Sequence, residues 1–180
     1  MHEHRFHGDI GRLRSPERLA WLEVDHVVEL SLQDGDFRRV LDVGTGSGIF
    51  AETFSKAGLD VVGVDANPKM LETARNLVPG VRFDDGIAES LPYPDGAFDL
   101  VFMGLLFHET DNRLQAMREA ARVAHQRVTV LEWPYKEQEI GPGLDERLTE
   151  KQVTDLAAQA GLKVWRVLPL HSLVLYVLER

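Results

Sequence analysis

Hydrophobic positions along the chain change period repeatedly, which predicts strands and helices in alternation. Short apolar runs with strand character cover residues 40–43, 60–65, 81–83, 98–107 and 127–133. Helical spacing of apolar residues, every three or four positions, begins after residues 48, 67 and 111. Leu77 is expected to face inward in the second of these helices, and Thr110 or Asp111 is expected to cap the third. Strands that alternate with helices are typical of parallel βαβ units in a doubly wound sheet.

The first regular pattern near the start of the chain predicts a helix. Ser15-Pro16-Glu17 combines a capping serine, a proline at the first helical position and an acid in the first turn. Helical spacing then continues to Leu30, which predicts one helix, and Gly35 marks its end. We therefore expect a single domain over 1–180, with an N-terminal flap and helix over 1–35 and a core over 36–180.

The last part of the chain predicts a helix followed by two adjacent strands. Thr149 and Gln152 have the spacing of a capping box, and the helix they begin ends at Gly161. Residues 163–168 and 173–178 are β-rich and have no helix between them, so one of these strands must run antiparallel. We expect a Rossmann-like α/β sheet of about seven strands, mostly parallel with one antiparallel C-terminal strand, and helices on both faces.

Composition and charge narrow the class of protein. The 180 residues are 44% hydrophobic and 27% charged, which is ordinary for a globular domain. No apolar run approaches the roughly 20 residues that span a bilayer, and no secretory h-region is present; we expect a cytoplasmic protein. A net charge of −9 argues against a nucleic-acid partner. The chain has no cysteine, and His2, His4 and His7 stand in a segment without periodicity that predicts no fixed geometry, so no metal is expected.

A glycine-rich turn follows the strand over residues 40–43. The turn reads Gly44-Thr45-Gly46-Ser47-Gly48, and glycines there allow tight turning and close approach of a ligand to the backbone. Asp65, at the end of the next strand, can accept hydrogen bonds from two ribose hydroxyls. Ile49 stands where the dinucleotide fingerprint has its third glycine, which disfavours a pyrophosphate ligand. Asp42, among apolar residues, needs a cationic or N–H partner.

Two longer stretches resemble a known family. VLDVGTGSGIFAETFSKAGLDVVGVDANPKMLETAR resembles the opening motifs of class I S-adenosylmethionine-dependent methyltransferases. AESLPYPDGAFDLVFMGLLFHE, followed by REAARV, resembles later motifs of the small-molecule group called methyltransferase type 11. The resemblance covers about residues 38 to 133. It implies S-adenosylmethionine as the cofactor, and transfer of its methyl group by in-line displacement to a small-molecule acceptor.

The resemblance also implies a set of cofactor contacts, position by position. The methionine end would lie against Asp42 and the loop of Gly44, Thr45, Gly46 and Gly48, and a carbonyl of Met103 or Gly104 would face its ammonium. The ribose would lie against Asp65, and the adenine against Ala66, Met70, Ala88 and Glu89. Many relatives have an aspartate where this chain has Ile87, so a side-chain contact to the adenine amino group is not expected.

The acceptor is expected over the ends of the fourth and fifth strands. His108 is the candidate base or acceptor contact, because the unperturbed pKa of histidine lies near neutrality. Glu109 and Glu132 lie at the same strand ends and are expected to be hydrogen-bonding carboxylates rather than bases, and Trp133 and Tyr135 are candidates for an aromatic wall around the acceptor. Relatives often close the site with their N-terminal segment, which suggests Phe6 and His7 as a cover over the cofactor.

Two other functions remain open on the sequence alone. One is a nicotinamide-dependent oxidoreductase, against which Ile49 and the lack of a recognisable catalytic dyad stand. The other is a non-catalytic module that binds S-adenosylmethionine. The sequence identifies neither the acceptor nor its accepting atom, and a monomer and a homodimer are equally compatible with it.

Overall fold

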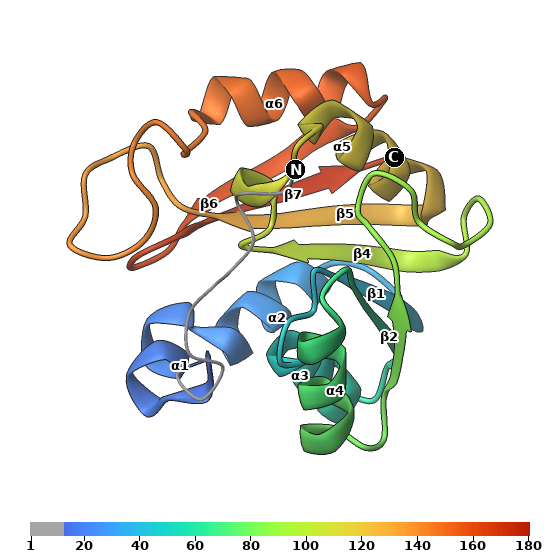
Figure 1. Ribbon diagram of the computed structural model, residues 1–180. Helices are drawn as coiled ribbons and strands as arrows, with labels where there is room; N and C mark the ends of the chain where they lie inside the picture. The colour runs from blue at the N-terminus through green and yellow to red at the C-terminus, as the bar shows by residue number, and fades with distance from the viewer. Residues whose placement is uncertain (1–12) are drawn as a thin grey trace.

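The structure, a computed structural model, describes residues 13–180 and is built on one seven-stranded sheet (Figure 1). The strand order is β3-β2-β1-β4-β5-β7-β6. The strands are β1 (Arg39–Val43), β2 (Asp60–Asp65), β3 (Arg82–Asp85), β4 (Phe98–Gly104), β5 (Ala124–Glu132), β6 (Lys163–Pro169) and β7 (Val174–Glu179). Strands β1 to β5 pair in parallel, and β7 pairs antiparallel with both β5 and β6. The expected fold class, with one antiparallel C-terminal strand, is confirmed.

Helices cover both faces of the sheet. They are α1 (Pro16–Leu22), α2 (Val24–Leu32), α3 (Ile49–Lys56), α4 (Pro68–Leu77), α5 (Arg113–Val123) and α6 (Glu150–Gln159), with a 3-10 turn η2 (Phe107–Glu109). Helices α1 to α4 pack on one face, and α5 and α6 pack on the other (Figure 1). None of the helices within residues 13–180 is long and apolar enough to cross a membrane.

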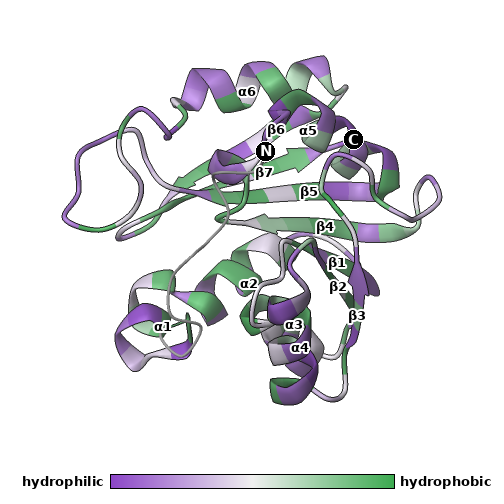
Figure 2. Ribbon diagram, viewed as in Figure 1, coloured by the Kyte–Doolittle hydropathy of each residue, from purple (hydrophilic) through white to green (hydrophobic). Residues whose placement is uncertain are grey.

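The central strands are buried on both faces, which explains why they read as continuous apolar runs. Val40 packs with the α2–α4 side, whereas its neighbour Leu41 packs with the α5–α6 side. Figure 2 shows hydrophobic residues concentrated on the strands, with hydrophilic residues on the outer faces of the helices. The two hydrophobic cores pack against opposite faces of the sheet. The strand ends that carry the loops are therefore fixed from both sides.

The expected single helix over residues 16–30 is wrong. Glu23 adopts a left-handed conformation (φ 49°, ψ 43°) and divides the segment into α1 and α2. The Glu23 carboxylate accepts a hydrogen bond from the backbone N–H of His171, 2.9 Å away. A non-glycine residue in this region needs such support from the surrounding structure. The break redirects α1 toward the carboxyl ends of the strands.

Three smaller expectations also need correction. Leu77 was expected to face inward but is 48% exposed, and Val78 takes the buried position. The strand expected over 98–107 ends at Gly104, because Leu105 is left-handed (φ 54°) and begins a separate loop. The cap of α5 is Asn112, whose side chain accepts from Gln115 N, and neither Thr110 nor Asp111. The capping box of Thr149 and Gln152 is present as expected. The division at residues 35 and 36 stays a prediction.

Candidate active site

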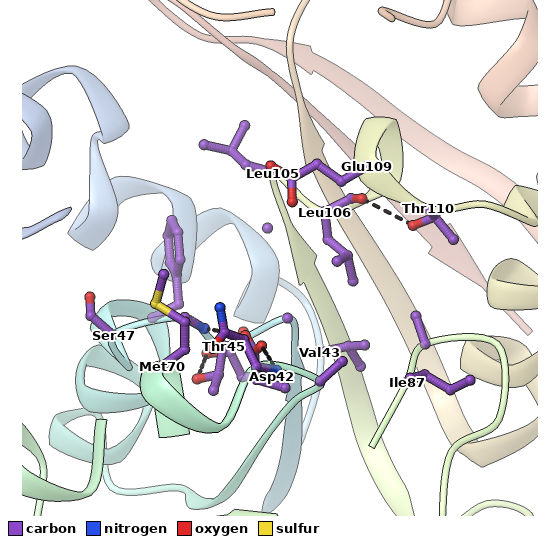
Figure 3. Close-up of a pocket in the computed structure, with 18 of the residues that line it drawn as sticks. Asp42, Val43, Thr45, Ser47, Met70, Ile87, Leu105, Leu106, Glu109 and Thr110 are labelled. Carbon is purple, nitrogen blue, oxygen red and sulfur yellow. Dashed lines mark hydrogen bonds between the residues drawn. The ribbon is translucent and has the colours of Figure 1, made fainter. Parts of the chain in front are cut away.

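A cavity of about 440 Å³ lies at the carboxyl ends of β1, β2 and β4 (Figure 3). Most of the residues expected to contact a cofactor line it: Asp42, Gly44, Thr45, Gly46, Asp65, Ala66, Met70, Ala88 and Glu89. Helix α1 contributes Arg18 and Leu22 to the lining, and the loop after β4 contributes Leu105 and Leu106. The chain therefore brings together residues from three strand ends, as expected for a ligand site in an open α/β sheet.

Six of the expected residues are absent from this lining: the acceptor-side candidates Glu132, Trp133 and Tyr135, and three others. Gly48 packs against the side chains of Phe83 and Val78, and the Met103 side chain is fully buried in the core. The His108 ring is directed toward Glu132 of β5. Gly104, the alternative to Met103, does line the cavity. The role expected for each of these residues, including those that line the cavity, remains a prediction. Phe6 and His7, with His2 and His4, lie outside the described residues.

The glycine loop is fastened to β2 and turns through left-handed conformations. Gly44, Gly46 and Gly48 have φ of 69°, 55° and 76°. The N–H groups of Gly44 and Thr45 both donate to the carbonyl of Val64, at 2.8 and 3.1 Å. A Cβ built on Gly46 would meet only the Gly44 carbonyl oxygen, at 4.0 Å, whereas one on Gly48 would lie 3.1 Å from the Phe83 ring. The backbone at Gly46 is thus open to the cavity, and that at Gly48 is packed.

Asp42 is a carboxylate buried beneath the loop. Its Oδ2 accepts hydrogen bonds from Thr45 Oγ1 at 2.7 Å and from the N–H of Ala51 at 3.1 Å. Burial raises the pKa of Asp42 to about 7; the hydrogen bonds from Thr45 and Ala51 act the other way, and the charge of Asp65 adds to the rise. A buried carboxyl group held this way in a cavity wall is suited to a cationic ligand group.

Asp65 is held at the end of β2 by the loop around it. Its Oδ2 accepts the N–H of Gly46 and its Oδ1 accepts the N–H of Asn67, both at 2.8 Å. These bonds fix the orientation of the carboxylate, which lines the cavity beside Ala66 and Met70. Carboxylate oxygens accept more than one hydrogen bond each, so the arrangement is compatible with hydroxyl donors from a ligand.

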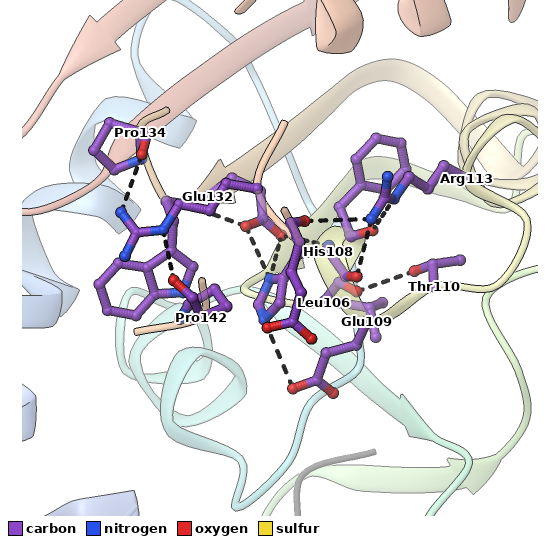
Figure 4. Close-up of polar contacts among 12 residues, drawn as sticks. Leu106, His108, Glu109, Thr110, Arg113, Glu132, Pro134 and Pro142 are labelled. Carbon is purple, nitrogen blue, oxygen red and sulfur yellow. Dashed lines mark hydrogen bonds and ion pairs between the residues drawn. The ribbon is translucent and has the colours of Figure 1, made fainter. Parts of the chain in front are cut away.

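His108 and Glu132 form a pair that the sequence did not predict (Figure 4). Nδ1 of His108 lies 3.1 and 3.0 Å from the two carboxylate oxygens of Glu132, and the His108 N–H donates to the same carboxylate. Glu132 is 3% exposed, and its Oε2 also accepts from Trp133 N. Glu132 is the last residue of β5, and His108 lies in the turn after β4, the parallel neighbour of β5, so the adjacency of these two strand ends is the signal that could have linked them.

The environment of His108 favours its charged form. Burial by itself lowers the pKa of the imidazole, but the hydrogen bond and charge of Glu132, followed by the charges of Glu109 and Glu146, outweigh this and raise it. Nε2 of His108 lies 3.7 Å from Oε1 of Glu109, which lines the cavity. The Arg113 side chain stabilises the η2 turn by donating hydrogen bonds to the carbonyls of Phe107 and His108.

Comparisons with known proteins identify related methyltransferases. A family model described as "Methyltransferase domain" matches residues 41–131. The chain is 42% identical over 93 residues to an uncharacterized methyltransferase, YcgJ, of Bacillus subtilis, covering 49% of this chain and 37% of that protein. It is 37% identical over 86 residues to a demethylmenaquinone methyltransferase of Chlorobaculum parvum, covering 47% of this chain and 36% of that protein. The chain thus spans well under half of the length of these curated relatives.

Solved structures extend the likeness over nearly the whole chain. A SAM-dependent methyltransferase from Aquifex aeolicus superposes with a TM-score of 0.85 at 27% identity, covering 94% of this chain and 96% of that one. These relatives are methyltransferases, as the resemblance of the two longer stretches implies, and this favours that interpretation over the oxidoreductase. The chain belongs to the methyltransferase-domain family, within the class I S-adenosylmethionine-dependent methyltransferases.

Proposed function

We propose that the protein transfers the methyl group of S-adenosylmethionine to a small-molecule acceptor. The observation that carries the proposal is the convergence of the buried Asp42, the open backbone at Gly46 and the oriented Asp65 on one cavity. A cavity of about 440 Å³ is in the range of small-molecule sites. Relatives named demethylmenaquinone methyltransferase support an acceptor that is a small molecule.

The lining fits the cofactor on chemical grounds. Asp42 is a buried acid with a raised pKa, so a ligand ammonium is its natural partner. Asp65 would accept hydrogen bonds from the ribose hydroxyls, and Ala66, Met70 and Ala88 would pack around the adenine. When bound, the cofactor supplies a methyl group on a sulfonium, which is activated for in-line displacement. The task of the chain is to hold donor and acceptor together and to exclude water.

The acceptor side of the cavity is assigned to the loop after β4. Leu105 and Leu106 form an apolar wall there, and Glu109 and Thr110 add polar groups (Figure 3). The left-handed Leu105 places this wall against the glycine loop: a Cβ on Gly44 would lie 2.9 Å from Cδ1 of Leu106. His108, backed by Glu132, is proposed to hold Glu109 at the cavity rim as a positioning residue.

A methyl-transfer assay tests the proposed function. The protein is incubated with methyl-labelled S-adenosylmethionine and a panel of phenols, quinols, amines and thiols, and label in extracted products is counted. We expect acceptor-dependent label that disappears in the Asp65→Ala variant. Binding of the cofactor without transfer to any acceptor class would instead favour a non-catalytic binding module.

Alanine at two loop glycines should separate ligand contact from packing. Both changes place a side chain in the left-handed region, which costs about 1–2 kcal/mol. Gly48→Ala adds the contact with Phe83, so it should lower the free energy of unfolding more than Gly46→Ala. Gly46→Ala points its methyl group into the cavity and should weaken S-adenosylhomocysteine binding more. Urea denaturation and calorimetric titration of both variants measure this; the reverse ranking would contradict the assignment.

Removing the charge of Glu132 should lower the pKa of His108. Glu132→Gln keeps the size of the side chain but loses the charge that stabilises the imidazolium. The measurement is an NMR titration of the His108 ring protons. Glu109→Gln serves as the comparison and should shift the pKa less, because Oε1 of Glu109 is 3.7 Å from the ring. An unchanged pKa in the Glu132→Gln variant would show that the pair does not control the charge of His108.

A further inference from the structure

The charges that line the cavity are unevenly distributed. Five acids of the described chain contribute to the lining: Asp42, Asp65, Glu89, Glu109 and Asp111. Arg18 is the only lysine or arginine in that lining among residues 13–180. It comes from α1, the short helix that the break at Glu23 directs toward the site. Arg18 therefore marks the one point of the described cavity wall where an anionic ligand group would meet a cation.

The guanidinium of Arg18 is held in place by stacking, and its hydrogen-bonding capacity is left for another partner. It lies 5.2 Å from the centre of the Trp21 ring, and Trp21 packs against Trp133 with 5.2 Å between ring centres. Nε of Arg18 is buried and makes no hydrogen bond with a described residue. Burial lowers the pKa of Arg18, while the charge of Glu109 acts in the opposite direction.

A neighbouring arginine shows a guanidinium whose terminal nitrogens are paired, although its Nε, like that of Arg18, makes no hydrogen bond with a described residue. Arg14 forms an ion pair with Glu52 and donates to the carbonyl of Ser47 at 2.8 Å. These contacts fasten the start of α1 to α3 and its preceding loop. Among residues 13–180, the guanidinium of Arg18, one helical turn further on, has only the Trp21 ring contact and the charge of Glu109. Its role is therefore different from that of a structural tether.

The chemistry of a guanidinium identifies the partner that would satisfy it. Its planar fork matches a carboxylate, and a partly desolvated cation without such a partner is costly. The α-amino-acid end of the proposed cofactor is a zwitterion, so Asp42 can meet only its ammonium. We propose that Arg18 is the carboxylate-binding residue of this cavity, an inference that rests on the proposed function. The carboxylate belongs either to the methionine part of the cofactor or to an acidic acceptor.

The first arm of the test uses calorimetric titration with two ligands. One is S-adenosylhomocysteine, and the other is its analogue that lacks the carboxylate but keeps the ammonium. If the cofactor supplies the carboxylate, wild type should prefer S-adenosylhomocysteine by about tenfold or more, and Arg18→Gln should abolish the preference. Arg18→Lys, which keeps the charge without the fork, should retain part of it. Glu17→Gln, at an exposed position of the same helix, should retain all of it.

The second arm identifies a carboxylate on the acceptor. Benzoate binding is followed by ligand-detected NMR, with the protein both free and saturated with S-adenosylhomocysteine. Benzoate binding that is lost in Arg18→Gln, with the preference in the first arm unchanged, would support the proposal and assign the anion to the acceptor. Arg18→Gln that alters neither arm would overturn it. If wild type fails to bind S-adenosylhomocysteine, the cofactor site is refuted instead. Benzoate binding to the free protein, compared between wild type and Arg18→Gln, would then still test Arg18 as a carboxylate-binding residue.

Discussion

Replacing Asp65 with alanine is expected to weaken S-adenosylmethionine binding by about a hundredfold or more. A hydrogen bond to a charged group contributes roughly 1.5–3 kcal/mol, and two ribose hydroxyls would be lost as donors. Since about 1.4 kcal/mol corresponds to a factor of ten, two such bonds exceed a hundredfold. The same change frees the N–H groups of Gly46 and Asn67, which orient the loop, and this adds to the loss. Calorimetric titration of the purified variant measures the effect.

Asp85→Ala is the matched control for this prediction. Asp85 is paired in register with Asp65 at the end of the neighbouring strand β3, but it is exposed and outside the cavity lining. Its replacement should leave the affinity unchanged. Asp65→Asn should lose less affinity than Asp65→Ala, because the amide oxygen still accepts a hydrogen bond. Wild-type affinity in the Asp65→Ala variant would show that this carboxylate does not bind the ligand.

Replacing Asp42 with asparagine is expected to stabilise the unliganded protein at neutral pH while weakening cofactor binding. The pKa of Asp42 rises from 3.8 in a free side chain to about 7 in the folded protein. A raised folded-state pKa means that the carboxyl group favours folding below pH 4 and that this contribution is lost as the pH rises toward 7. Asparagine removes this dependence and can still accept the hydrogen bonds of Thr45 and Ala51.

Urea denaturation at several pH values measures the stability part of this prediction. The gain of Asp42→Asn over wild type should be small near pH 4, grow up to about pH 7 and then level off at roughly 2–4 kcal/mol. Affinity for S-adenosylhomocysteine should fall, since the ammonium loses its anionic partner. A variant that is less stable than wild type at every pH, with unchanged affinity, would contradict this account of Asp42.

Asp99→Asn provides a control of opposite sign. Although burial alone would raise the pKa of Asp99, hydrogen bonds from the N–H groups of Arg39 and Arg38 lower it overall. A lowered folded-state pKa contributes stability above the unfolded value, which is lost as the pH falls. Asp99→Asn should therefore reduce stability at neutral pH. The contrast separates the burial of Asp42 from a general effect of removing an acid.

The parts of the fold that the sequence predicted are those set by local periodicity. The parallel strands appear as apolar runs because both faces of the sheet are covered, and the antiparallel β7 follows from two strands without a helix between them. The cavity position follows in the same way, because the glycine loop and Asp65 each come directly after a strand. Each of these features depends on residues that are close together in the chain.

The features that the sequence did not predict depend on contacts between distant segments. The left-handed Glu23 is supported by His171, 148 positions away, and no local pattern indicates the break between α1 and α2. The pairing of His108 with Glu132 depends on β4 and β5 being neighbours in the sheet. Arg18 reads as an ordinary charged residue of an amphipathic helix, and only the redirection of α1 brings it to the cavity wall.

The most direct test of the cofactor assignment is calorimetric titration of the wild-type protein with S-adenosylmethionine, S-adenosylhomocysteine and NADH. The account predicts micromolar binding of both adenosyl ligands and none of NADH, because the loop and Asp65 surround a nucleoside site and Ile49 replaces the glycine of the dinucleotide fingerprint. Binding of NADH without either adenosyl ligand would contradict the assignment of this cavity to S-adenosylmethionine.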